Sequence, residues 1–66
     1  MTTEDFRAAL SRLGLSQAAL ARLLAELGDT AQPSTILRRI ERWIQGTRRV
    51  PGEMAALLTL LERQRD

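Results

Sequence analysis

The segment Ser34–Gly46 has the sequence STILRRIERWIQG, and it decides the fold of this 66-residue chain. Its apolar residues recur three and four positions apart, which predicts a helix with an inward face about 120° wide. Ser34 is expected to cap this helix, and Gly46 is expected to end it. The apolar face carries Ile36, Leu37, Ile40, Trp43 and Ile44.

The opposite face of this helix is polar and basic. Arg39 flanks it on one side and Glu41 on the other, where Glu41 is expected to pair with a neighbouring arginine rather than to contact cytosine. A guanidinium can donate two hydrogen bonds to guanine or to a phosphate, so this face is a candidate for DNA contact. Its members are Thr35, Arg38, Arg42 and Gln45.

The net positive charge of the chain is confined to this part of it. Between Ser34 and Gly52 there are five arginines and one acid, Glu41, which gives a net charge of +4. The rest of the chain holds five arginines and seven acids, for a net charge of −2. A confined basic stripe favours a surface that contacts phosphates, and the alternative is a solvated helix face in an arginine-rich protein.

Two more helices are predicted before this segment, over Thr3–Leu13 and Gln17–Leu27. Thr2 or Thr3 can cap the first, and Gly14 ends it. Ser16 can cap the second. Because the turn between them is very short, the two helices are expected to cross sharply and pack on each other. A loop over 28–33 then leads to the central helix.

A basic loop, residues 47–50, and a last helix over about 51–65 complete the chain, with Pro51 in the first turn of that helix. No strand pattern competes, so the sequence predicts an all-α single domain over 1–66, a compact four- to five-helix bundle. Leu60 lies off the main apolar stripe of this last helix. It is either a dimer contact or a partly buried core residue. The candidate dimer residues are Met54, Leu57, Leu58, Leu60 and Leu61.

The composition excludes several classes of function. The chain has no Cys and no His, which excludes disulfides, thiol and Ser-His-Asp catalysis and the usual zinc sites. The eight acids are scattered, so no enzyme activity, metal, cofactor or small-molecule ligand is expected. Apolar runs are too short to span a membrane, and the charged first twenty residues do not form a signal peptide. A cytoplasmic protein is therefore expected.

Two stretches resemble a known family. LGLSQAALARLL (Leu13–Leu24) resembles the L-S-Q-x-x-L-A signature in the second helix of Cro- and lambda-repressor-like (Xre-type) helix-turn-helix regulators. RWIQGTRRVPGEMAALLTLL (Arg42–Leu61) is similar to the R-W-x-x-G-x-x-x-V-P ending of small phage and prophage regulators. Some proteins encoded beside anti-CRISPR genes, which repress their own operons, are of this kind.

The resemblance implies roles for individual residues. Gln17 matches a residue that touches a phosphate, although an ordinary exposed position is the alternative. Trp43 matches a tryptophan that packs beneath the recognition helix. The other implied DNA contacts are Arg38 and Arg39 with bases, Arg42 with a phosphate or a base, Arg48 and Arg49 with the backbone, and Ser34 and Thr35 at the helix tip.

One departure from the family concerns the interval between Leu24 and Trp43, which is several residues longer than in a typical member. The extra residues lie around Ala25–Pro33. Three arrangements are open: a longer second helix, an expanded loop, or an extra turn in the third helix. Because Glu26 and Asp29 are acidic, this segment is not expected to make strong phosphate contacts.

The leading hypothesis is a sequence-specific, double-stranded DNA-binding regulator of bacterial or phage origin. It would act as a homodimeric repressor of its own gene and recognise an inverted repeat with half-sites about 34–36 Å apart, or a multiple of that distance. The alternative is a small helical protein-interaction module, such as an antitoxin or a phage-encoded inhibitor, whose arginines meet an acidic partner. The two differ in whether binding to DNA depends steeply on salt.

Overall fold

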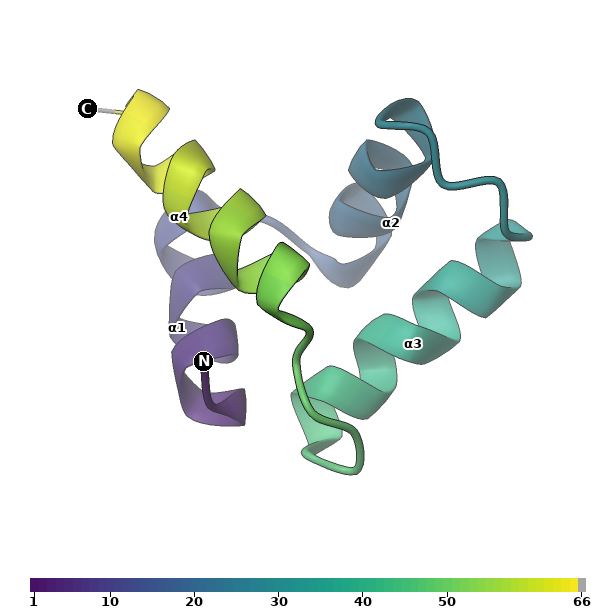
Figure 1. Cartoon of the computed structure of the whole chain (residues 1–66), viewed down its shortest axis with the longest axis horizontal. Helices are drawn as coiled ribbons and strands as arrows, with labels where there is room; N and C mark the ends of the chain where they lie inside the picture. Colours follow the sequence, from purple (N-terminus) through teal and green to yellow (C-terminus); the bar gives the residue numbers. More distant parts are fainter. Residues whose placement is uncertain (66) are drawn as a thin grey trace.

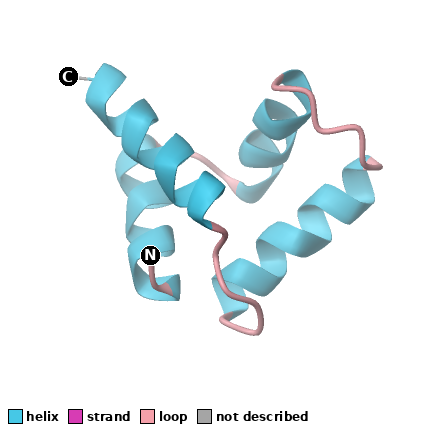
Figure 2. Ribbon diagram, viewed as in Figure 1, coloured by secondary structure: helices cyan, strands magenta, loops and turns pink. Residues whose placement is uncertain are grey.

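A computed structural model describes residues 1–65, and Figures 1 and 2 show its helices joined by loops. The helices are α1 (Thr3–Leu13), α2 (Gln17–Glu26), α3 (Pro33–Gln45) and α4 (Gly52–Arg65). No strand occurs within that range, so the prediction of an all-α fold is confirmed. Asp66, the last residue of the domain predicted over 1–66, lies outside the described residues.

The ends of the first two helices follow the predicted caps. The Thr2 hydroxyl accepts a hydrogen bond from Asp5 N at 3.1 Å, and the Asp5 carboxylate accepts one from Thr2 N at 3.2 Å. Ser16 caps α2 by accepting from a backbone amide three residues later. Gly14 and Gly46 end α1 and α3 with φ of 66° and 79°, a left-handed conformation that glycine adopts without strain.

The structure corrects two predicted helix starts. Ser34 does not cap α3, because the helix already begins at Pro33 and Gln32 precedes it with an extended backbone and no capping side chain. Proline suits the first helical position because its φ is already helical and the N–H it lacks would have no helical partner. Pro51 lies just before α4 rather than inside it, and its carbonyl accepts the first amide hydrogen bonds of that helix.

The central helix α3 packs against both α2 and α1, while α4 packs against α1. Phe6 on α1 and Trp43 on α3 meet edge to face, with ring centroids 5.9 Å apart and planes at 84°. The backbones of α1 and α2 lie farther apart than their short connection predicts, because each of these helices packs against α3 instead. The prediction that they pack closely on each other is therefore wrong.

All four helices contribute to one apolar core. Trp43 belongs to it, as predicted, and so does Val50 from the loop between α3 and α4. This packing fixes the direction in which the opposite, polar side of α3 faces. The buried residues are Phe6, Ala9, Leu10, Leu20, Ala21, Ile36, Ile40, Trp43, Val50, Met54 and Leu58.

The extra residues between the second and third helices form an expanded loop, one of the three arrangements that the sequence left open. α2 ends at Glu26 and α3 begins at Pro33. Within the loop, Asp29 Oδ1 accepts a hydrogen bond from Ala31 N at 3.0 Å. A short side chain that bonds to the backbone two residues ahead fixes a turn, so this loop has a defined shape.

Candidate nucleic-acid interface

The polar face of α3 is exposed because the apolar face is held in the core. Ile36, Ile40 and Trp43 are at most 9% exposed. The structure therefore leaves every predicted DNA-contact residue accessible to a ligand. These exposed residues are Gln17, Ser34, Thr35, Arg38, Arg39, Arg42, Gln45, Arg48 and Arg49.

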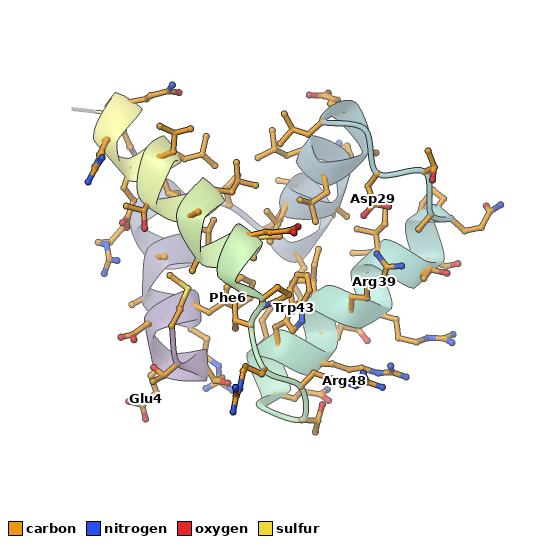
Figure 3. All side chains as sticks on the ribbon, viewed as in Figure 1. Glu4, Phe6, Asp29, Arg39, Trp43 and Arg48 are labelled. Carbon is orange, nitrogen blue, oxygen red and sulfur yellow. The ribbon has the colours of Figure 1, made fainter. Side chains whose placement is uncertain are left out.

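Four of the predicted residues come together at one place, which we call the arginine cleft. This cleft has a volume of about 290 Å³. Figure 3 shows Arg39, Trp43 and Arg48 beside α3. Helix α3 supplies one part of the cleft and the loop after it supplies the rest. Its lining residues are Arg39, Arg42, Trp43, Arg48, Arg49 and Pro51.

The loop returns to α3 because several of its groups share one acceptor. The carbonyl of Arg42 accepts hydrogen bonds from Gly46 N and Thr47 N, the latter at 3.0 Å, and from the Thr47 hydroxyl at 3.3 Å. Arg48 N lies 3.4 Å from the same oxygen. This tight reversal brings the side chains of Arg48 and Arg49 beside that of Arg42.

One arginine of the cleft has an acidic partner. Arg39 Nη1 lies 3.4 Å from Asp29 Oδ2, and Figure 3 shows the two side chains facing each other between α3 and the preceding loop. The Arg39 side chain remains 49% exposed. Glu41 was expected to pair with a neighbouring arginine, but it makes no ion pair within residues 1–65, and Asp29 pairs with Arg39 instead. The prediction for Glu41 is corrected accordingly.

The end of α3 is also held from α1. Arg7 donates hydrogen bonds from Nε and Nη2 to the carbonyl of Ile44, which directly follows Trp43 of the arginine cleft. Arg7 was not predicted as part of the site, because the sequence around Arg7 does not indicate a contact to a residue so far along the chain. Only its position on the polar side of the first helix, near a predicted helix end, could have suggested it.

The remaining predicted residues are not gathered into the arginine cleft. Arg38, Gln45, Ser34 and Thr35 belong to the exposed face of α3 but do not line the cleft. Gln17 is exposed at the start of α2, on a different helix. A ligand that touches all of these residues must therefore extend well beyond the cleft.

The structure narrows the predicted dimer surface on α4. Met54 and Leu58 are 6% and 0% exposed, because they belong to the core of the single chain. They have almost no surface to offer a second copy, so the prediction is corrected at these two positions. Leu57 and Leu61 are half-buried, and Leu60 is 51% exposed.

Two further observations concern metal ions and membranes. Within residues 1–65, no three acidic side chains gather closely enough to hold a metal ion. Each described helix is too short or too polar to cross a lipid bilayer.

No protein-family model, curated protein or solved structure gives a significant match to the chain. The structural class is thus a small all-α protein of four helices, and its function has to be argued from the arginines.

Proposed function

We propose that the chain is a sequence-specific, double-stranded DNA-binding transcriptional regulator. In this proposal α2, the loop and α3 act as a helix-turn-helix, and two copies recognise an inverted repeat and repress their own gene. The class is that of the Cro- and lambda-repressor-like (Xre-type) regulators, which the sequence resembles. Within that class the sequence resembles the small phage and anti-CRISPR-associated autorepressors.

The observation that carries the proposal is the continuity of the arginine cleft with the exposed face of α3. Arg42 belongs to both, so one ligand can contact the cleft and the helix face together. A duplex offers such a ligand, because its phosphates flank the base edges of a major groove that is about 12 Å wide. Four guanidiniums around one cleft favour an anion, and phosphates are the anions of the DNA backbone.

The proposal divides the residues into two roles. Arg38, Arg42 and Gln45 on the outer face of α3 would enter the major groove and contact base edges, with Arg39 beside them. Phosphate contacts set the position of the helix on the duplex but carry no sequence information. The proposed phosphate contacts are Gln17, Ser34, Thr35, Arg48 and Arg49.

Fluorescence anisotropy tests this proposal on the purified chain. The probes are a duplex from upstream of its own gene and a scrambled duplex, at about 150 mM salt. We expect at least about a thousandfold preference for the upstream duplex, the lower end of the range for specific binding. Arg42→Ala should reduce that preference. Arg48→Ala should weaken binding to both duplexes and reduce the salt slope by about one unit.

Arg22→Ala is the matched control, because Arg22 is exposed on α2 and does not line the arginine cleft. It should leave the preference and the salt slope unchanged. Equal, weak binding of the unmodified chain to both duplexes would contradict the proposal. The second hypothesis, a helical interaction module with an acidic protein partner, would then account better for the arginines.

A further inference from the structure

A second surface of the molecule is apolar and unpartnered. Helices α2 and α4 do not pack on each other, and Figure 1 shows their carboxyl-terminal ends diverging. Between them lies a cleft of about 310 Å³, which we call the leucine cleft. Its lining residues are Leu13, Leu15, Leu23, Leu61, Gln64 and Arg65.

The apolar surface continues beyond the cleft on both helices. Leu27, the C-cap residue of α2, follows Leu23 by about one helical turn and is 61% exposed. Leu60 neighbours Leu61 on α4 and is 51% exposed. Apolar surface next to an apolar cleft is favourably removed from water, so this region has the character of a surface that another apolar surface covers. The chain itself has no described segment that reaches it.

We propose that a second copy of the chain covers the leucine cleft through a two-fold symmetric contact. In such a contact the same patch of each copy meets itself, so the α2 wall of one copy faces the α4 wall of the other. The inference rests on the proposed function only in that an inverted repeat needs two copies. The surface itself is derived from the leucines and from the charges at its rim.

Those charges are complementary under a two-fold axis. Glu26 lies three residues after Leu23, so an acid ends the α2 wall. Arg63 lies three residues after Leu60, so a base ends the α4 wall. Both side chains are exposed, and neither makes an ion pair within residues 1–65. A two-fold contact that places the carboxyl-terminal end of α2 beside the carboxyl-terminal end of α4 in the second copy would pair Glu26 with Arg63 of that copy.

The contact leaves the proposed DNA-binding surface free. No residue of α3 and none of the loop after it lines the leucine cleft. The arginine cleft, in turn, has no residue from α2 or from α4. Dimer formation and DNA binding can therefore occur at the same time on different faces of one chain.

Sedimentation equilibrium of the full chain tests the contact directly. At about 100 µM we expect twice the mass of one chain, and both Leu27→Glu and Leu60→Glu should raise the dissociation constant at least about tenfold. Both side chains are exposed, so these substitutions leave the core intact, which circular dichroism checks. Ala8→Glu is the control, because Ala8 is exposed on α1 and does not line the leucine cleft, and it should leave the dissociation constant unchanged.

A charge exchange tests the two-fold arrangement. Glu26→Arg and Arg63→Glu should each weaken the dimer, because each places like charges opposite each other. The double variant recreates the opposite-charge pair with its members exchanged, so it should recover most of the lost affinity. A double variant as weak as the single variants would overturn this arrangement of the two walls.

The outcomes separate this inference from the proposed function. A chain that stays monomeric at about 100 µM overturns the leucine-cleft contact, even if it binds its upstream DNA. A dimer that Leu27→Glu and Leu60→Glu weaken supports the contact, even if the protein ignores that DNA. A dimer that neither substitution weakens uses another surface and overturns the inference.

Discussion

Arg7 on α1 donates two hydrogen bonds to the carbonyl of Ile44 in the last turn of α3, at 2.9 Å from Nε and 2.5 Å from Nη2. The carbonyls of a last helical turn have no partner within their own helix, and the positive guanidinium faces the negative end of the helix dipole. The contact joins the first helix to the end of the helix that carries the arginines. It therefore holds α3 in place just before the loop that completes the arginine cleft.

Replacing Arg7 by alanine should lower the stability of the fold by about 1 kcal/mol, because the carboxyl-terminal end of α3 loses its charged donor. In a domain of this size that loss corresponds to a melting temperature about 4–8 °C lower. Thermal unfolding followed by circular dichroism measures it. Arg22→Ala removes an exposed arginine that makes no side-chain hydrogen bond among the described residues, and it should change the melting temperature little. Equal melting temperatures for the two variants would show that the Arg7 contact contributes nothing.

Asp29 competes with phosphate for Arg39 if the proposed function is right. Asn at position 29 keeps an oxygen that can accept from Ala31 N, but it removes the charge that faces Arg39. Arg39 is then free to turn toward a phosphate at the arginine cleft. We expect Asp29→Asn to bind a scrambled duplex more tightly than the unmodified chain does, with a salt slope steeper by about one unit.

The double variant Asp29→Asn with Arg39→Ala is the control for this prediction. Without Arg39, removing the charge of Asp29 frees no guanidinium to contact a phosphate. The gain in affinity and in salt slope should therefore disappear. Anisotropy titrations at several salt concentrations measure both quantities. If the gain persists without Arg39, the effect of Asp29 is one of general charge rather than of a specific pair.

Much of the fold could be predicted from local patterns, because helix ends depend on neighbouring residues. The extents of α1 and the end of α3 follow from Thr2, Gly14 and Gly46, whose capping roles act within a few positions. The start of α3 was misassigned because serine is a good N-cap residue and proline is a good first residue of a helix. In the structure the helix begins at Pro33, because proline lacks the N–H that would need a partner at that position.

The site was predictable only as far as its residues share one segment. The grouping of Arg42, Arg48 and Arg49 follows from their closeness along the chain and from the glycine turn between them. The partners of the site, Arg7 and Asp29, come from other segments, and no local pattern indicates them. The core positions of Met54 and Leu58 were equally hidden, because an apolar stripe does not tell which of its residues face their own chain.

Gly46 is required at the end of α3 for two physical reasons. Its φ is +79°, and a Cβ placed there would lie 3.3 Å from the hydroxyl oxygen of Thr3. We expect Gly46→Ala to lower the free energy of unfolding by about 1–2 kcal/mol, the ordinary strain of a left-handed residue with a side chain. Urea denaturation measures the change.

Gly52→Ala is the opposite case within the same molecule. Gly52 begins α4 with no positive φ, and a Cβ there would meet nothing within 4 Å. Alanine should therefore raise the free energy of unfolding by about 0.4–1 kcal/mol, because it restricts the unfolded chain. The same sign of change for both variants would contradict the assignment of strain to Gly46.

The cap of α1 makes stability depend on pH. Hydrogen bonds from the backbone and hydroxyl of Thr2 are the main cause that lowers the pKa of the Asp5 carboxyl below its usual value of 3.8. A group with a lowered folded pKa stabilises the fold above its unfolded pKa, and that contribution is lost as the pH falls through the folded pKa. The unfolding free energy should therefore drop below about pH 4, and Asp5→Asn should show a smaller drop.

Glu4→Gln is the control in the same helical turn, because Glu4 makes no side-chain hydrogen bond among residues 1–65. Urea denaturation at about pH 7 and about pH 3 gives the drop for each variant. An equal drop in Asp5→Asn and Glu4→Gln would show that the Thr2 cap does not couple folding to the charge of Asp5.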